Sequence, residues 1–225
     1  MPETTSKLWT QVDHYLADLF APVDDALTAA LEANHKADLP AIDVPPLLGK
    51  FLALLIQISG AKRVLEIGTL GGYSTTWMAR AIPADGKVIT LELEPRHAEI
   101  ARANITRAGV MDRVEIRLGA ALKSLQALHE SNAAPFDFIF IDADKKSLPE
   151  YLDWSLKLAH KGTILVADNV IRDGKIINAK SSDQNVQGAR GFLELAAANP
   201  RLNATAIQSV DRKGYDGFAM AVVTS

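Results

Sequence analysis

A chain of 225 residues with 24 basic and 27 acidic side chains is long enough for one substantial hydrophobic core, so we expect a single domain spanning residues 1–225. The net charge of −3 argues against binding to nucleic acid or an anionic membrane surface, and the absence of cysteine excludes disulfides, thiolate metal sites and a cysteine nucleophile. No segment resembles a signal peptide or approaches the roughly 20 apolar residues that span a bilayer, so we expect a cytoplasmic protein.

Two helices are predicted within residues 1–60. Apolar and aromatic side chains recur every three or four residues from Leu8 to Phe20, which predicts an amphipathic helix whose aromatic face needs a partner. Residues 47–59 are apolar nearly all round and follow Pro45 and Pro46, which predicts a buried helix. These helices form an N-terminal extension to the rest of the chain.

Residues 61–225 alternate short apolar runs with helical patterns, which is typical of a parallel sheet covered by helices on both faces. The final two apolar runs predict a hairpin that adds two strands to this sheet. The predicted strands are RVLEIG, KVITLE, VEIRL, FDFIFID, TILVAD, LNATAIQSV and GFAMAVV, and the predicted helices cover residues 74–81, 95–109, 121–131, 148–159 and 185–198.

The loop after the first predicted strand contains Gly68, Gly71 and Gly72, but its spacing is neither G-x-G-x-x-G nor a phosphate-binding G-K-[ST]. Glu66, at the end of that strand, would repel a pyrophosphate and suits a cationic ligand. Glu92 ends the second strand, where a carboxylate can accept hydrogen bonds from ribose hydroxyls. The two acids indicate a positively charged nucleoside such as S-adenosylmethionine. An equally good interpretation is that they mark strand ends that meet water.

Oxygen-bearing side chains follow the fourth and fifth predicted strands. Asp142 ends one strand, and Asp168 and Asn169 end the other. If these strands are neighbours, the three side chains form an all-oxygen set that suits Mg²⁺, or another divalent cation such as Mn²⁺ or Ca²⁺. Either aspartate alone could instead cap a helix or solvate a turn. Lys145 lies close to this set, and because a nearby cation disfavours a lysine's charged form, Lys145 is a candidate general base, whereas Lys146 is expected on the surface.

These motifs, in this order, resemble the cation-dependent O-methyltransferases, the family of the caffeoyl-coenzyme A and catechol enzymes, and particularly its small bacterial members. The resemblance covers most of the chain, from DVPPLLGKFLALL through RVLEIGTLGGYST, FIDADKK and ADNV to YDGFAMAVV. It implies a Rossmann-like class I methyltransferase fold, α/β, with a seven-stranded, mostly parallel sheet whose last strand is antiparallel. Residues 1–60 would form the helical extension and residues 61–225 the core.

The resemblance also implies an activity, which is Mg²⁺-dependent transfer of a methyl group from S-adenosylmethionine to a hydroxyl of a catechol-type acceptor. It implies that Asp142, Asp168 and Asn169 bind the metal and that Lys145 is the catalytic base. It further implies a homodimer, in which the N-terminal helices contribute to the substrate site, and a small aromatic diol or its coenzyme A ester as the acceptor. The methyl-donor contacts that it implies are Val44, Glu66, Gly68, Thr69, Ser74, Glu92, Ala120, Ala121, Asp142 and Asp144.

The loop after ADN departs from the plant members of the family, because it reads VIRDGK instead of a tryptophan-asparagine sequence. The resemblance therefore does not extend to the identity of the acceptor, the oxygen that is methylated, or the choice between substrate contact and loop solvation for Arg172 and Asp173. The histidines lie in or beside predicted helices and are expected to be surface or packing residues, not ligands: His14, His35, His97, His129 and His160.

Two other functions are compatible with a similar sheet. A nicotinamide-dependent oxidoreductase is one of them, although the imperfect glycine pattern and Glu66 count against it. The other is a non-catalytic nucleoside-binding module, which would bind the donor without metal dependence and without methyl transfer to any diol.

Overall fold

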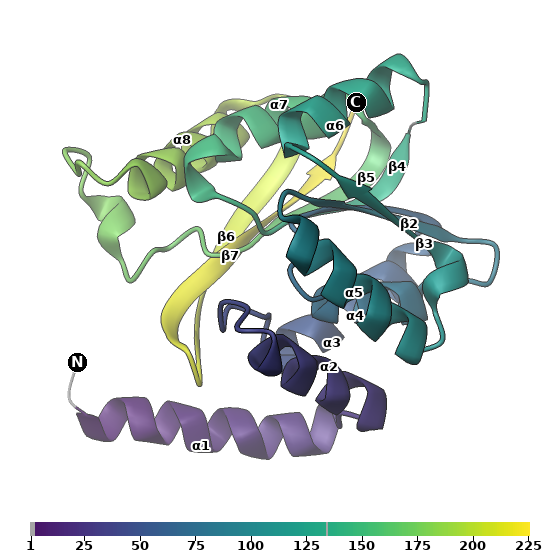
Figure 1. The fold of residues 1–225 in the computed structure, drawn as a ribbon. Coiled ribbons are helices and arrows are strands. Elements are labelled where there is room, and N and C mark those ends of the chain that lie inside the picture. The colour runs from purple at the N-terminus through teal and green to yellow at the C-terminus, as the bar shows by residue number, and fades with distance from the viewer. Residues whose placement is uncertain (1–2, 134) are drawn as a thin grey trace.

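The computed structural model describes residues 3–133 and 135–225, and within these residues seven strands form one sheet in the order β3-β2-β1-β4-β5-β7-β6 (Figure 1). Strands β1 to β5 run parallel, whereas β7 is antiparallel to both β5 and β6. This confirms the predicted α/β fold with an antiparallel last strand. The strands are β1 (Arg63–Ile67), β2 (Lys87–Glu92), β3 (Val114–Leu118), β4 (Phe136–Ile141), β5 (Ala159–Ala167), β6 (Leu202–Asp211) and β7 (Gly214–Val223).

Helices cover both faces of the sheet (Figure 1). Helices α6, α7 and α8 pack on one face, while α3, α4 and α5, with α2 beyond them, pack on the other. None of the helices in the described part of the chain is long and apolar enough to cross a membrane. The helices are α1 (Glu3–Phe20), α2 (Asp25–Lys36), α3 (Pro46–Ser59), α4 (Tyr73–Ala81), α5 (Pro95–Arg107), α6 (Ala121–Glu130), α7 (Leu148–Lys157) and α8 (Gln184–Ala198).

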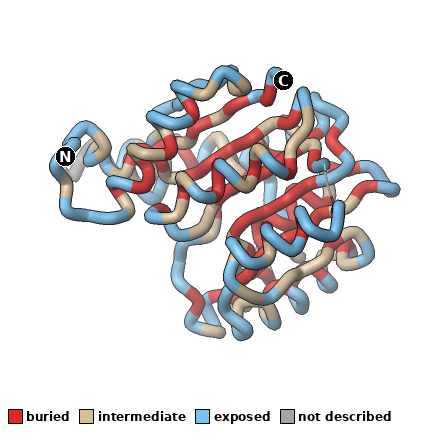
Figure 2. The backbone as a smooth tube through the Cα atoms, turned by 90° about the horizontal axis from the view of Figure 1, so that it is seen from above, coloured by how far each residue is buried: buried red, intermediate tan, exposed pale blue. Residues whose placement is uncertain are grey.

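Each central strand contributes side chains to two hydrophobic clusters, one on each face of the sheet. In β4, Phe138 and Phe140 enter the cluster beneath α3, α4 and α5, whereas Ile139 and Ile141 enter the cluster beneath α6, α7 and α8. Successive side chains of a strand point to opposite faces, so a strand that is covered on both faces must be apolar throughout. Figure 2 shows the resulting concentration of buried segments in the middle of the molecule.

Two features of the observed elements differ from the sequence prediction. Helix α2 was not predicted, although Asp24 caps it by accepting a hydrogen bond from the backbone nitrogen of Leu27 at 2.9 Å. Strand β5 begins at Ala159, where a helix was predicted, because Thr163 accepts from the backbone nitrogen of His160 and donates to the carbonyl oxygen of Phe136. These bonds draw residues 159–162 into the sheet.

The apolar stripe of α1 remains exposed within the described chain. Leu8, Tyr15 and Phe20 have relative exposures of 57%, 65% and 61%, so the partner that the sequence predicts for this face does not come from the described part of the chain. Large exposed apolar surfaces of this kind are typical of sites where another molecule binds.

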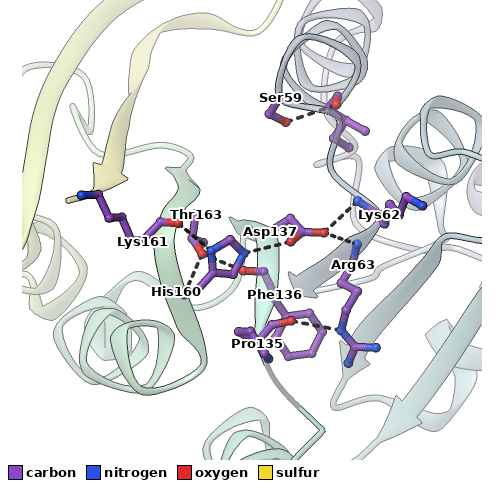
Figure 3. A network of polar contacts seen from close by, with 10 residues as sticks. Ser59, Lys62, Arg63, Pro135, Phe136, Asp137, His160, Lys161 and Thr163 are labelled. Atoms are coloured by element: carbon purple, nitrogen blue, oxygen red, sulfur yellow. Dashed lines mark hydrogen bonds and ion pairs between the residues drawn. The ribbon is translucent and has the colours of Figure 1, made fainter. Parts of the chain in front are cut away.

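A polar network joins the first residues of β1, β4 and β5 at the edge of the sheet opposite the glycine loop (Figure 3). Asp137 Oδ2 accepts hydrogen bonds from the backbone nitrogens of Lys62 and Arg63, both at 2.8 Å. Asp137 Oδ1 lies 2.9 Å from His160 Nε2. The hydrogen bond with Asp137 raises the pKa of His160 above its ordinary value. The network thus ties three strands together through one carboxylate.

We expect Asp137→Ala to lower the free energy of unfolding by about 1–3 kcal/mol, because two strand amides lose their acceptor. Since the pKa of His160 is raised in the folded state, its contribution is complete below the unfolded value, about 6.5, and is lost as the pH rises through the folded value. The destabilisation, measured by urea unfolding, should therefore be largest near pH 6 and smaller at higher pH. Asp153→Ala, at an exposed carboxylate on α7, is the control. A destabilisation that is independent of pH would contradict this account of His160.

Candidate active site

The carboxyl ends of β1, β4 and β5 lie at the same level of the sheet. The backbone nitrogen of Asp142 donates to the carbonyl oxygen of Ile67 at 2.9 Å, and that of Asp168 donates to the carbonyl oxygen of Ile141 at 3.0 Å. Asp142 and Asp168 directly follow strand residues that are paired in the register of β4 and β5. The fourth and fifth strands, β4 and β5, are therefore adjacent in the sheet as predicted, and the loops that follow them lie side by side.

Asp142 and Asp168 form a crowded acidic pair. Asp168 is only 7% exposed, and burial together with the charge of Asp142 raises its pKa well above the ordinary value. Asp168 Oδ1 accepts a hydrogen bond from the backbone nitrogen of Asn169 at 2.8 Å. Asn169 has a φ of 54°, a left-handed conformation that asparagine tolerates better than most residues. This turn keeps Asn169 beside the pair.

Lys145 is buried next to the aspartates, whereas Lys146 is exposed. Lys145 Nζ donates to Asp142 Oδ1 at 2.7 Å. Its backbone lies in a short 3-10 helix, η2 (Lys145–Ser147), against Gly188 of α8, where any Cβ would collide with the Lys145 carbonyl oxygen. Gly188 was not singled out from the sequence, although a glycine inside a helical pattern often marks such a close approach.

The donor set at this edge fits a divalent cation. Two carboxylates and one carboxamide provide only oxygen ligands, and a cation between them would relieve the repulsion that raises the pKa of Asp168. Within residues 3–133 and 135–225, no three His, Cys, Asp or Glu side chains converge as a metal site, so a cation here would need Asn169, water or substrate oxygens besides the two aspartates.

A narrow cleft lies between the glycine loop and the segment before α3. Gly68 has a φ of 102°, and a Cβ there would collide with the carbonyl oxygen of Asp142, so this position requires glycine. The close approach brings the loop against the acidic edge formed by Asp142, Asp168 and Asn169. The cleft is lined by Ile42, Asp43, Val44, Gly68, Thr69, Leu70, Tyr73, Ser74 and Asp142.

Glu66 does not line this cleft. Side-chain hydroxyls of the chain itself provide the hydrogen bonds to its carboxylate. Ser74 Oγ donates to Glu66 Oε1 at 2.5 Å, and the hydroxyls of Thr75 and Thr90 donate to Oε2. Glu66 is fully buried, and this burial raises its pKa to about 7. Glu66 therefore orients Ser74, which does line the cleft. The two threonines were not identified from the sequence.

Glu92 braces the other side of the glycine loop. Its Oε2 accepts hydrogen bonds from the backbone nitrogens of Thr69 and Leu70, at 3.2 and 2.8 Å. The backbone nitrogen of Gly119 donates to the carbonyl oxygen of Glu92 at 2.8 Å, which holds the start of α6, Ala120 and Ala121, beside the end of β2. These residues lie near Glu92 but outside the cleft wall.

Asp144 is turned away from the cleft. Its carboxylate accepts hydrogen bonds from the hydroxyls of Ser147 and Tyr151, both at 2.6 Å. Burial and the bond to Asp144 raise the pKa of Tyr151 above its ordinary value. The observed contacts tie Asp144 to Ser147 and Tyr151 at the start of α7, unlike Asp142 two residues earlier.

A second, larger cavity of about 320 Å³ opens beside the first. Asp168 and Asn169 line it, and Ile42 and Val44 lie on the walls of both cavities, so the two spaces adjoin each other at these residues. Asp173 lines this cavity, whereas Arg172 does not. None of the five histidines, all within the described residues, lines either space. The apolar wall of the larger cavity includes Leu47, Leu48, Phe51 and Phe218.

Comparison with known proteins identifies relatives that are described as O-methyltransferases. The O-methyltransferase family model matches residues 21–214. A protein named catechol O-methyltransferase from Niastella koreensis is 51% identical over 97% of this chain and 99% of its own length. The crystal structure of an O-methyltransferase from Bacillus cereus in complex with SAH has a TM-score of 0.96 and 55% identity over 97% of this chain and all of its own. An O-methyltransferase from Streptomyces achromogenes, involved in tomaymycin synthesis and solved with SAM, has a TM-score of 0.95 and 44% identity, with both chains fully covered.

Proposed function

Because the chain belongs to the O-methyltransferase family and is an S-adenosylmethionine-dependent enzyme, we propose that it methylates a hydroxyl of a catechol-type acceptor with the help of a divalent cation, Mg²⁺ in the first instance. The observation that carries this proposal is that Asp142 lines one of the two adjoining cavities and Asp168 and Asn169 line the other, while Lys145, which lines neither, donates a hydrogen bond to Asp142. Family membership sets aside both the nicotinamide-dependent oxidoreductase and the non-catalytic module.

The narrow cleft is the proposed site of the methyl donor. Val44, Gly68, Thr69, Ser74 and Asp142 would contact the donor directly, since they line the cleft. Glu66 would act through Ser74. Glu92, with Ala120 and Ala121 beside it, would bind the nucleoside end through Oε1, which accepts one backbone hydrogen bond and lies 3.4 Å from His97 Nδ1, whereas Oε2 accepts two. The geometry lends no support to a donor contact from Asp144.

Four side chains would prepare the acceptor hydroxyl for methyl transfer. Asp142, Asp168 and Asn169 would hold a divalent cation, which when bound supplies Lewis acidity that lowers the pKa of a hydroxyl placed against it. Lys145, whose Nζ lies 2.7 Å from Asp142 Oδ1, would in its neutral amine form accept the hydroxyl proton and become the ammonium. The acceptor oxygen then bonds to the donor's methyl carbon as the carbon–sulfur bond breaks. The chain accelerates this step by holding oxygen and carbon about 3 Å apart and in line.

The larger cavity is the proposed acceptor site. Its apolar wall suits an aromatic ring, and Asp168 and Asn169 at one end would direct a vicinal pair of hydroxyls to the cation. The name of the Niastella koreensis relative, catechol O-methyltransferase, supports this acceptor class.

The proposal is tested by incubating the purified protein with isotope-labelled S-adenosylmethionine, a panel of catechols and matched monophenols. We expect mass spectrometry to detect labelled methyl ethers of catechols only, and only with Mg²⁺. Equal methylation of monophenols, or of catechols in the presence of a chelator, would contradict the proposal.

The exposed stripe of α1 supports the homodimer that the family resemblance implies. Leu8, Val12, Tyr15, Leu19 and Phe20 are all exposed on this helix and could pack against a second copy. Light scattering of the purified protein should give twice the mass of one chain, and a monomer at micromolar concentration would contradict this expectation.

A further inference from the structure

Asp13, on α1, is an unexpectedly buried acid in the wall of the larger cavity. It is 5% exposed, and its Oδ2 is a buried oxygen without a hydrogen-bond partner. Within the described residues it is the only carboxylate oxygen in that condition. An unpaired buried polar atom costs free energy, so an acid with such an atom in the wall of a binding cavity is a candidate for a contact with the ligand.

The charges around the cavity favour a positively charged group. The cavity is lined by one basic side chain, Lys213, and by several acidic ones: Asp13, Asp168, Asp173, Asp211 and Asp216. Lys213 donates to the backbone carbonyl oxygen of Asp43, so its ammonium is already engaged. Arg212, next to Asp13, offsets only part of this charge.

The other acids of the wall have partners in the chain, and Asp13 itself accepts a backbone hydrogen bond from Arg212, which leaves its Oδ2 unpaired. Asp216 Oδ1 accepts from two backbone nitrogens, Asp211 Oδ1 accepts from the backbone nitrogen of Lys213, and Asp173 lies 3.1 Å from Lys175 Nζ. Asp168 belongs to the proposed metal-binding edge, which consists of Asp142, Asp168 and Asn169. Asp13 is therefore the acid in this wall best placed to bind a cation that arrives with the substrate.

Asp13 lies at the end of the cavity away from the metal-binding edge. It is close to Asp211 and Arg212 at the tip of the β6–β7 hairpin, where Asp211 pairs with Gly214. Gly217, three residues further along β7, accepts from the backbone nitrogen of Val170 next to the metal-binding edge. At about 3.4 Å per residue the two ends are about 10 Å apart. An aromatic ring with a short side chain covers most of that span.

We propose that Asp13 determines acceptor specificity by binding a protonated amine on the side chain of the catechol, opposite the two hydroxyls. This inference rests on the proposed function, because it assumes that the hydroxyls lie at the metal-binding edge. An ammonium in the cavity would donate a charge-assisted hydrogen bond to the Asp13 carboxylate. The same acidic wall disfavours acceptors with a carboxylate side chain.

The test compares three catechols of similar size: dopamine, 4-propylcatechol, which replaces the ammonium with a methyl group, and 3-(3,4-dihydroxyphenyl)propanoate. We expect wild-type kcat/KM to be about tenfold or more higher for dopamine than for 4-propylcatechol, and lowest for the carboxylate. Asp13→Asn should bring the dopamine-to-propylcatechol ratio close to one and improve the relative rate of the carboxylate. Asp18→Asn, at an exposed acid on the same helix, should keep the wild-type ratio.

A wild-type protein without preference for dopamine, or an Asp13→Asn variant that keeps it, would overturn the inference. If no catechol is methylated, the proposed function fails, and the amine contact is then decided by calorimetric binding of dopamine and 4-propylcatechol. Tighter binding of dopamine that Asp13→Asn abolishes supports the contact, and equal binding overturns it. The wild-type comparison does not depend on how well the variant folds.

Discussion

Asp168→Ala is expected to lower methyl transfer to a catechol by roughly 1000-fold, because Lewis-acid stabilisation by a metal ion is worth several kcal/mol and each 1.36 kcal/mol is a factor of ten. The substitution removes one of the two carboxylates that would hold the cation. Donor binding should survive, since Asp168 does not line the narrow cleft. The measurement is kcat for the reaction together with a calorimetric Kd for S-adenosylmethionine.

Chelation should reproduce this loss in the wild-type protein. EDTA is expected to abolish transfer, and an excess of Mg²⁺ should restore it in the wild type but not in Asp168→Ala. Asp112→Ala, whose carboxylate side chain is 78% exposed, is the control for loss of one negative charge. Full activity of the wild type after exhaustive removal of divalent cations would contradict the metal-dependent mechanism.

Lys145→Met is expected to lower kcat by about 100-fold or more at neutral pH, which is the usual contribution of a positioned general base. Methionine keeps an apolar stem of similar length in this buried position, so the change removes mainly the amine. The rate optimum should move to higher pH, where the catechol ionises without a base. The measurement is the pH profile of kcat at saturating Mg²⁺.

The acidity of the acceptor separates proton transfer from other effects of Lys145. A more acidic acceptor such as 4-nitrocatechol depends less on a base, so its rate should fall less in Lys145→Met than that of 4-propylcatechol. Lys146→Met, at the exposed neighbouring lysine, should behave like the wild type. If both acceptors lose the same factor in Lys145→Met, Lys145 acts by some means other than accepting the proton.

The sequence alone predicted most of the sheet, because strands covered on both faces must be apolar throughout and their ends are marked by polar residues. The run FDFIFI and the acid directly after it were sufficient to locate β4 and Asp142. The set of motifs also identified the family, which the family model and the relatives confirm. The predicted end of the helix at Ala159 and the predicted start of the next strand at Thr163 were wrong, because β5 begins at Ala159. Thr163 determines this start through hydrogen bonds to His160 and to Phe136 of β4, a strand that is distant in sequence.

The tertiary structure decided which of the polar residues face the cavities. Glu66, near the end of β1, and Asp144, just beyond β4, are acids close to strand ends, as Asp142 is, yet neither lines the narrow cleft. Hydroxyl groups of Ser74 and Tyr151 donate hydrogen bonds to their carboxylates. Asp13 belongs to an amphipathic helix in the sequence, and only the packing of α1 near the β6–β7 hairpin makes it a wall of the acceptor cavity. Local periodicity determines elements because each depends on its own residues, whereas the direction of a polar side chain depends on partners that only the folded chain brings near it.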